Sequence, residues 1–197
     1  MFTGIVQSIG EVRAITPRGG DVELLIGAPG LDLSSVAIGD SISCSGCCLT
    51  VTRIEDDAFA ADASVETLNV TTLGQWRSGA RLNLEKALCA GQPLGGHYVT
   101  GHVDGIATVV ERTNDARSIR VQFEAPAELA RYIARKGSVC IDGVSLTVND
   151  VDGARFSVNL IPHTLEVTTL DEYRAGARVN LEVDIIARYL ERLHAVA

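Results

Sequence analysis

The chain has 197 residues, and its 17 basic and 25 acidic side chains give a formal charge of −8. Its share of hydrophobic residues (46%) and of charged residues (21%) is typical of a folded globular protein and excludes a disordered chain. The acidic balance argues against nucleic acid as a partner, and no apolar segment approaches the ~20 residues that span a bilayer. Because the N-terminal sequence also lacks a secretory signal, we expect a cytoplasmic protein that binds neither nucleic acid nor membranes.

The first 86 residues have the pattern of short strands separated by turns. Apolar and polar residues alternate in runs such as Leu49–Ile54, as in half-buried strands. Turn-forming residues recur at Pro17–Asp21, Gly39–Asp40 and Glu55–Asp57. This spacing predicts about six antiparallel strands, and a closed barrel is favoured because closure removes exposed strand edges.

Residues 98–184 repeat this first domain at an offset of 97 positions. Without gaps, 28 of the 85 residues in 1–85 are identical to their counterparts in 98–182. The longest shared block aligns Thr67–Leu73 with Thr164–Leu170. The chain is therefore a tandem duplication of domains 1–86 and 98–184, joined by a linker at residues 87–97 that contains Gly and Pro.

Two helices are predicted in the second half. Pro126 precedes a segment that favours a helix as far as Arg135, since proline in the first turn costs no hydrogen bond. The tail at residues 185–197 has no counterpart in the repeat, and one helical face of it carries Ile186, Tyr189, Leu190 and Leu193. This face either packs on the barrels of its own chain or forms a contact between subunits, and the tail sequence alone leaves both open.

Several positions at which the two copies differ carry chemically active side chains. Ile5 is aligned with His102, Cys48 with Ser145, Ser45 with Asp142, and Glu66 with His163. A nucleophile or an acid–base group in one copy only is what a reaction with two unlike roles requires. Drift between duplicates is the alternative, with Cys48 as a small buried thiol and His102 as a hydrogen-bonded rim residue.

The five cysteines, at positions 44, 47, 48, 89 and 140, indicate a reducing compartment without disulfides. A zinc site at Cys44 and Cys47 would need a second such pair, and the repeat has Ile141 and Val144 at the equivalent positions. We therefore predict no metal site. Motifs of dinucleotide-binding folds, phosphate-binding loops and serine hydrolases are also absent from the sequence.

Five short motifs occur in a fixed order along the duplicated chain. They lie at Met1–Gln7, Gly46–Val51, Gly95–Gly105, Asp142–Val148 and Leu160–Glu166. With these motifs in this order, the chain resembles the alpha-chain type of riboflavin synthase, and the resemblance covers essentially the whole chain.

The resemblance implies a dismutation of two molecules of 6,7-dimethyl-8-ribityllumazine. One molecule gives a four-carbon unit to the other, and the products are riboflavin and 5-amino-6-ribitylaminouracil, in the final step of riboflavin biosynthesis. No metal or organic cofactor is implied. Each half would be a six-stranded antiparallel Greek-key barrel that binds one lumazine.

The resemblance also implies an assembly. The family is a homotrimer in which the N-terminal barrel of one subunit faces the C-terminal barrel of its neighbour, so that an active site holds two lumazines. The tail helix at 185–197 would then be the trimer contact, and a lumazine synthase capsid is a further expected partner.

The resemblance also implies site residues, at the positions of this chain that match the motifs of the family. The N-terminal pocket would use Gly4, Ile5, Val6, Ser41, Cys48, Leu49, Thr50, Asp62, Ala63, Ser64, Val65, Glu66 and Thr67. The C-terminal pocket would use Gly101, His102, Val103, Lys136, Ser145, Leu146, Thr147, Ile161, Pro162, His163, Thr164, Leu165 and Glu166. Phe2 would cover the flat ring at the mouth. His102 is the candidate for proton transfer from the acidic 7-methyl group, and Cys48 and Ser145 are candidates for activating or positioning the rings.

Two other functions are weighed against this one. A non-catalytic lumazine- or flavin-binding carrier shares the duplicated fold, but such carriers usually have a degraded second site, whereas this chain keeps Gly101–His102 and Ser145–Val148. A flavin-reductase-type barrel would need a flavin-stacking Arg-x-Tyr-Ser strand and a separate nucleotide domain, and the sequence has neither.

Overall fold

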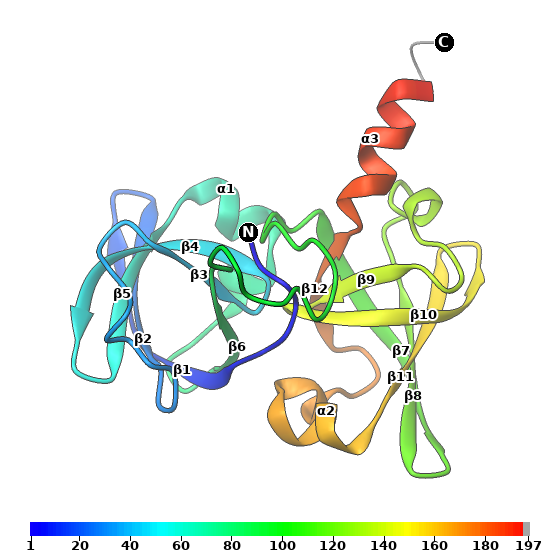
Figure 1. Cartoon of the computed structure of the whole chain (residues 1–197), viewed down its shortest axis with the longest axis horizontal. Coiled ribbons are helices and arrows are strands. Elements are labelled where there is room, and N and C mark those ends of the chain that lie inside the picture. The colour runs from blue at the N-terminus through cyan, green and yellow to red at the C-terminus, as the bar shows by residue number, and fades with distance from the viewer. Residues whose placement is uncertain (195–197) are drawn as a thin grey trace.

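The computed structural model describes residues 1–194, which form two β-barrels side by side (Figure 1). The first barrel consists of β1 (Ser8–Arg18), β2 (Asp21–Gly27), β3 (Ser41–Cys44), β4 (Cys47–Glu55), β5 (Ala58–Ala63) and β6 (Arg81–Lys86). Its strands pair antiparallel in the closed order β1-β2-β5-β4-β3-β6. Because β2 and β3 are consecutive in sequence but not paired, the connectivity is of the Greek-key kind.

The second barrel repeats this topology strand by strand. It consists of β7 (Gly105–Asp115), β8 (Ser118–Glu124), β9 (Ser138–Ile141), β10 (Val144–Asp152), β11 (Arg155–Leu160) and β12 (Arg178–Val183). The closed order β10-β11-β8-β7-β12-β9 matches that of the first barrel when equivalent strands are compared. The predicted fold class, two tandem six-stranded antiparallel barrels with a C-terminal helix, is confirmed.

The duplication extends to the irregularities of the strands. The register shifts between Val51 and Arg53 in β4, and again between Val148 and Asp150 in β10, at the equivalent positions 97 residues later. A bulge of this kind bends the strand and increases its twist, which helps so few strands to close. The curvature of both barrels is therefore specified by the repeated sequence.

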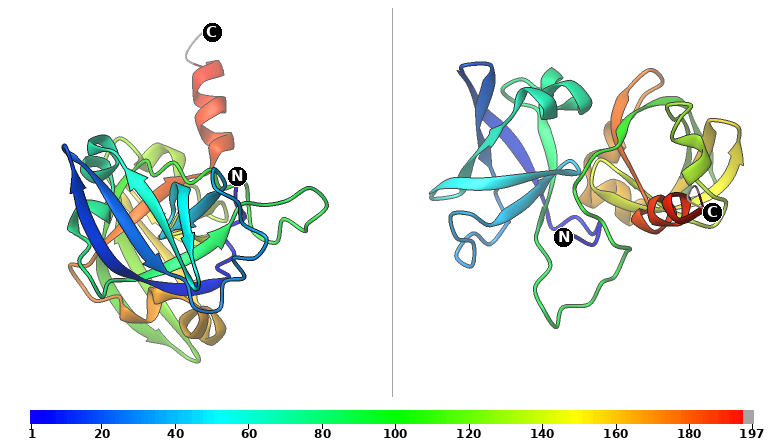
Figure 2. Two further views of the ribbon diagram at one scale, coloured as in Figure 1. Left: turned by 90° about the vertical axis from the view of Figure 1, so that its left-hand side faces the viewer. Right: turned by 90° about the horizontal axis from the view of Figure 1, so that it is seen from above.

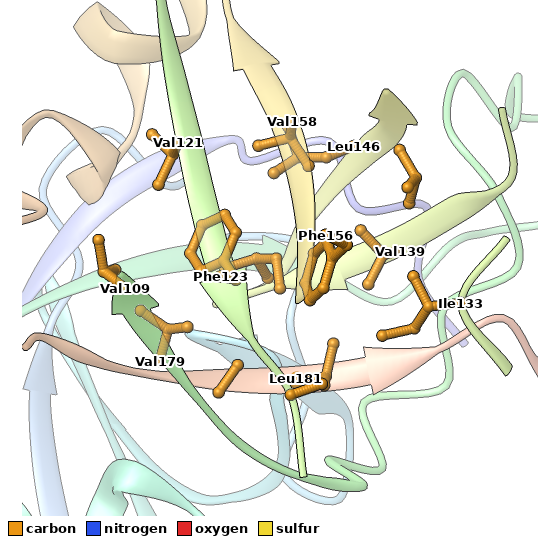
Figure 3. Close-up of a cluster of buried hydrophobic side chains, with 14 of the residues drawn as sticks. Val109, Val121, Phe123, Ile133, Val139, Leu146, Phe156, Val158, Val179 and Leu181 are labelled. Atoms are coloured by element: carbon orange, nitrogen blue, oxygen red, sulfur yellow. The ribbon is translucent and has the colours of Figure 1, made fainter. Parts of the chain in front are cut away.

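Each barrel has its own apolar core. In the second barrel the rings of Phe123 and Phe156 stack with centroids 5.3 Å apart, and Tyr173 meets Phe123 edge-on at 6.0 Å. Figure 3 shows these two phenylalanines among inward-facing valines and leucines from several strands. Alternating strand residues thus fill the interior of each barrel and leave no room for a ligand there. A ligand would have to bind at the open end of a barrel, which we call its rim.

Short helices follow the fifth strand of each barrel. Helix α1 (Val65–Val70) comes after β5, and helix α2 (Pro162–Val167) comes after β11. The side chain of Ser64 caps α1 by accepting a hydrogen bond from the N–H of Thr67 at 3.3 Å, and α2 begins with proline. These helices were not predicted, because six residues are too few to show a helical period.

The helix predicted from Pro126 to Arg135 is wrong. The segment contains only a 3-10 turn at Ala130–Tyr132, and Ile133 has an extended backbone. Leu129 and Ile133 both pack into the second core, at 5% and 6% exposure. Burial of these two side chains against a strongly curved barrel ends the helix after one turn.

Helix α3 (Ile185–His194) projects away from the second barrel (Figures 1 and 2; Figure 2 shows it from the side in its left view). The side chains of the predicted apolar face are exposed, by 54% at Ile186, 68% at Tyr189, 51% at Leu190 and 71% at Leu193. This face therefore does not pack on the barrels of its own chain. Residues 195–197 of the predicted tail helix lie outside the described residues. Within residues 1–194, no helix combines the length and the apolar character that a membrane span needs.

The two barrels are joined by a reciprocal pair of asparagines, Asn83 in β6 and Asn180 in β12. Asn83 accepts a hydrogen bond from the N–H of Thr169 and donates one to the carbonyl of Asp142, both at 2.8 Å. Asn180 makes the equivalent bonds in the opposite direction, at 2.7 and 2.8 Å. Both side chains are 1% exposed, so the barrels form one body with a buried polar interface.

Candidate functional site

The segment that precedes the first strand of each barrel crosses to the other barrel. The carbonyl of Gly4 accepts a hydrogen bond from the N–H of Ser145 at 2.8 Å. In the equivalent contact, the N–H of Cys48 donates to the carbonyl of Gly101 at 2.9 Å. Each candidate pocket is therefore lined by both halves of the chain.

This exchange corrects the predicted grouping of pocket residues. Gly4–Val6 were assigned to the N-terminal pocket, but they lie against the second barrel, and Val6 packs on its core. Gly101–Val103 lie against the first barrel, and Val103 packs on that core. The repeat identifies equivalent positions, but it carries no information on which of two similar barrels a connecting segment contacts.

A buried carboxylate holds each crossing segment. Glu85 accepts hydrogen bonds from the N–H and hydroxyl of Thr3 at 2.7 and 2.6 Å and from the N–H of Gly4 at 2.9 Å. Glu182 holds the Thr100–Gly101 pair in the same way, at 2.6, 2.7 and 3.0 Å. Burial raises the pKa of both carboxyl groups, and these hydrogen bonds oppose that rise. The repeated Thr-Gly and Glu positions are thus a clamp that fixes the segments at the site.

Glycine is required where the crossing segments touch the opposite barrel. Gly4 has φ of +75°, and a Cβ there would lie 2.6 Å from the Cβ of Ser145. Gly101 has φ of +79°, and a Cβ there would lie 2.6 Å from the Cβ of Cys48. Both backbone conformation and space exclude a side chain, which brings the backbone directly against the two candidate groups.

Ser145 has a histidine partner that the sequence analysis did not count as a site residue. The Nδ1 atom of His97 lies 2.7 Å from Ser145 Oγ. Burial lowers the pKa of this imidazole. His97 lies within the Gly95–Gly105 motif, so a sequence signal was present, but the motif alone did not assign this residue a role.

Cys48 is the thiol that reaches the rim of the first barrel. Its neighbour Cys47 points to the other face of β4 and is buried, as strand alternation predicts. Burial raises the pKa of Cys47 to about 12 and that of Cys44 well above its usual value, so both stay protonated. Cys48 is half-buried, beside Gly101.

His102 is exposed and lies on the crossing segment at the first barrel, next to Gly101. The prediction that Phe2 covers a ligand is wrong. Phe2 is completely buried between the barrels, where it pairs with Val99 and packs against Cys140. An aromatic side chain with no exposed surface cannot contact a bound ring, so Phe2 supports the crossing segment instead.

Most of the remaining predicted residues lie around the same end of each barrel. In the first barrel, Ser41 pairs with Thr50 across β3 and β4, and Asp62–Thr67 run from the end of β5 into α1. Ser41 also lines a cavity of about 300 Å³ next to the linker. The side chains of Leu49 and Ala63 point into the core, so only their backbone can contribute to binding.

The rim of the second barrel is equivalent. Thr147 pairs with Ser138 across β10 and β9, and Lys136 precedes β9. The Ile161–Glu166 segment contains the N-cap residue and most of α2. The side chain of Leu146 belongs to the core. Ile161 is 53% exposed, as Ile5 on the crossing segment is 49% exposed. The rims are thus open surfaces with apolar side chains in them.

Asp142 lies beside a cavity of about 280 Å³ between the barrels, away from the rims. Its carboxylate accepts hydrogen bonds from the hydroxyl of Tyr173 and the N–H of Asn180, both at 2.7 Å. Desolvation outweighs these bonds and raises the pKa of Asp142 to about 7. This residue, which differs from its counterpart Ser45, belongs to the interface rather than to a pocket rim.

Comparisons with known proteins agree with the duplicated architecture. The lumazine binding domain family matches the chain twice, at residues 3–87 and 100–184. The chain is 46% identical to a riboflavin synthase of Brucella abortus over 198 residues, covering 98% of each chain. It is 45% identical to that of Photobacterium phosphoreum over 193 residues, covering 98% of this chain and 88% of the relative.

Solved structures of LumP have the same fold. LumP complexed with riboflavin superposes with a TM-score of 0.84 at 31% identity, over 93% of this chain and 99% of LumP. The LumP complex with 6,7-dimethyl-8-(1′-D-ribityl) lumazine gives a TM-score of 0.83 at 29% identity, with the same coverage. With two lumazine binding domains and relatives of this identity over nearly its full length, the chain belongs to the riboflavin synthase family.

Proposed function

We propose that the chain catalyses the dismutation of two 6,7-dimethyl-8-ribityllumazine molecules to riboflavin and 5-amino-6-(D-ribitylamino)uracil. A four-carbon unit passes from one lumazine to the other, so the two substrates together supply all atoms of the two products. One molecule is donor and the other acceptor of the same unit. The reaction therefore balances without an external oxidant, reductant or cofactor.

The reciprocal exchange of segments is the observation that carries the proposal. Two equivalent rims, each completed by a glycine of the other half, suit two molecules of one ligand. The rims nevertheless present different groups, a thiol at Cys48 and a hydroxyl at Ser145. A carrier of a single ligand needs neither a second rim nor this difference, whereas a reaction between two identical substrates in unlike roles needs both.

We assign the chemical roles as follows. His102, exposed at the rim of the first barrel, moves the proton of the 7-methyl group. Cys48 and Ser145 activate or position the two rings. Backbone N–H and carbonyl groups at the strand ends, together with the hydroxyls of Thr50 and Thr147, bind the pteridine edge and the ribityl chain.

The largest contribution to the rate should come from holding two flat rings in register. Orientation of two reactants can supply roughly 7–11 kcal/mol, against ~10²–10⁴-fold for proton transfer. The rims are exposed in one chain, which favours a second subunit opposite each of them. We therefore propose a homotrimer in which the first barrel of one subunit faces the second barrel of its neighbour, with α3 as the contact.

Two further parts of the proposal concern the surroundings of the protein. The five free thiols suit the reducing cytoplasm. A lumazine synthase shell stays a predicted partner, because it would supply the lumazine substrate directly.

The test is incubation of the purified protein with 6,7-dimethyl-8-ribityllumazine and no added cofactor. Riboflavin and the pyrimidine product should form in equal amounts, with two lumazines consumed for each riboflavin. Ligand titration should show two lumazine sites per chain. Binding of one lumazine without conversion would contradict the proposal and indicate a carrier protein instead.

A further inference from the structure

His97 is held in a fixed position against Ser145 by the end of the linker. Besides the 2.7 Å contact between Nδ1 and Ser145 Oγ, the N–H of His97 donates to the carbonyl of Thr3 at 3.2 Å. A Cβ on the preceding Gly96 would lie only 2.1 Å from that same carbonyl oxygen and 3.0 Å from Ser145 Oγ. His97 is 8% exposed, so backbone contacts and burial fix the imidazole before any ligand binds.

The proton arrangement of this pair follows from its surroundings. Burial lowers the pKa of His97, so at neutral pH the ring is neutral and carries one N–H. The Nε2 atom is buried and has no hydrogen-bond partner within residues 1–194. Since buried donors without an acceptor are rarer than buried acceptors without a donor, the hydrogen belongs on Nδ1. His97 then donates to Ser145 Oγ, and the hydroxyl hydrogen of Ser145 points away from the imidazole.

The counterpart of Ser145 in the first barrel is Cys48, and within residues 1–194 no histidine is hydrogen-bonded to its side chain. Beside Cys48 the structure has the apolar cluster of Phe2, Val99 and Cys140, and the Phe2 ring lies 2.9 Å from the position of a Cβ on Gly101. A fixed hydroxyl on one rim thus corresponds to a thiol beside an aromatic ring on the other.

We propose that His97 is a positioning residue that fixes the Ser145 hydroxyl as a hydrogen-bond donor to the ring bound at the second barrel. The proposal rests on the proposed function, in which each rim holds one lumazine. A hydroxyl directed at a ring nitrogen or carbonyl oxygen withdraws electron density from the ring and costs no reorganisation during the reaction. Because a thiol is a weaker donor, His97 makes the two lumazine sites electronically different.

A double-mutant cycle tests whether His97 acts through Ser145. We expect His97→Ala and Ser145→Ala each to lower kcat by about tenfold or more. The double variant should be no slower than Ser145→Ala alone, because removing the hydroxyl removes what His97 positions. Losses that multiply would show an independent role and overturn the proposal. Cys89→Ser, at an exposed position of the same linker, is the control and should keep wild-type kcat.

A conservative variant separates positioning from general-base catalysis. The side-chain amide of His97→Asn can donate a hydrogen bond from nearly the position of Nδ1, but it cannot take up a proton. We expect kcat of His97→Asn to recover to within about threefold of wild type. If His97→Asn is as slow as His97→Ala while circular dichroism shows both folded, the proposal fails.

The tautomer can be measured without any turnover. In ¹⁵N NMR spectra of the ligand-free protein, the nitrogen shifts should show the hydrogen of His97 on Nδ1, and a hydrogen on Nε2 would overturn the proposal. Failure of the proposed function is a separate result, namely wild-type protein that forms no riboflavin.

Discussion

Single side chains at the rims and at the interface carry distinct chemistry in this molecule. His102 is exposed at the first rim, whereas Asp142 lies between the barrels, although both are positions at which the two copies differ. The first is open to a ligand in the proposed function, and the second has a pKa near neutral pH. The two positions lead to separate predictions.

Replacement of His102 should affect turnover more than binding. His102→Ala removes the proposed proton carrier but leaves the clamp at Thr100 and Gly101 intact, because that clamp uses backbone groups and the hydroxyl of Thr100. We expect lumazine affinity to be retained and kcat to fall by ~10²–10⁴-fold. Fluorescence titration with lumazine and steady-state kinetics measure the two effects. Unchanged kcat, or loss of binding, would contradict the role.

Asp142 should make folding stability depend on pH. Its pKa is about 7 in the folded protein, above the ordinary value of 3.8. Because the pKa is raised, the protonated Asp142 side chain contributes fully to the free energy of unfolding below about pH 4. This contribution is lost as the pH rises to about 7, by up to about 1.4 kcal/mol per pH unit. Asp142→Asn cannot titrate, yet its amide oxygen can still accept one of the two hydrogen bonds.

Urea unfolding at several pH values across this range measures the effect. The decline in the free energy of unfolding should be shallower for Asp142→Asn than for wild type. It should not vanish, because the raised pKa of Glu85 and Glu182 acts in the same direction. Asp152→Asn, at an exposed strand end, is the control. Parallel pH profiles for Asp142→Asn and wild type would show that Asp142 does not titrate in this range.

At the scale of elements, the repeat and the strand alternation were sufficient to predict the two barrels. Elements whose form depends on the tertiary structure were not predictable. The segment from Pro126 has helix-forming residues, but the barrel buries Leu129 and Ile133 and limits it to one turn. For α1, the Ser64 cap with Thr67 three positions later was an available signal that periodicity alone did not reveal.

The candidate site, like the fold, was predictable only in part. Motif positions identified residues that do gather at the barrel rims, such as Cys48 and Ser145. The exchange of Gly4 and Gly101 between barrels was not predictable, since both barrels offer the same partner position to either segment. Phe2 was misplaced because nothing in the sequence distinguishes an aromatic ring buried at an interface from one at a pocket mouth.

Helix α3 is the element on which the proposed assembly depends. Deletion of residues 185–197 removes the exposed apolar face, so we expect a monomer and a loss of activity larger than that of His102→Ala. Sedimentation analysis and the riboflavin assay measure the two outcomes. Arg192→Ala, on the same helix but outside the apolar face, should remain trimeric. Full activity in a truncated monomer would contradict both the trimer and its importance for catalysis.

At the scale of the whole molecule, the reciprocal asparagines and crossing segments make the barrels dependent on each other. Each barrel supplies buried hydrogen-bond partners to the other, through Asn83 in one direction and Asn180 in the other. Unfolding of one barrel would break these hydrogen bonds and expose the interface of the other barrel to water, so that barrel would lose the stabilisation that the interface gives. We therefore expect the two barrels to unfold together.

Unfolding can be followed in each barrel separately. The single tryptophan, Trp76, is 8% exposed and packs in the core of the first barrel, while far-UV circular dichroism reports on both barrels. The two transitions should coincide. Asn180→Ala, in the second barrel, should lower stability by about 2–4 kcal/mol and shift the Trp76 transition with it. Asn114→Ala, at an exposed hairpin of the second barrel, should shift neither. Separate transitions for the two signals would contradict this coupling.

The crossing segments also bear on ancestry. A half-length chain that carried only one barrel would form its Thr-Gly clamp by itself, because the clamp carboxylate and the Thr-Gly pair belong to the same half. It could satisfy its Gly contact by pairing with an identical chain around a twofold axis. Such a symmetric dimer would already contain both rims, and they would be identical. Fusion of the two genes through a linker would preserve every contact while releasing the two copies from identity. A linker histidine could then serve one rim alone, and a symmetric pair of binding sites could become a donor site and an acceptor site.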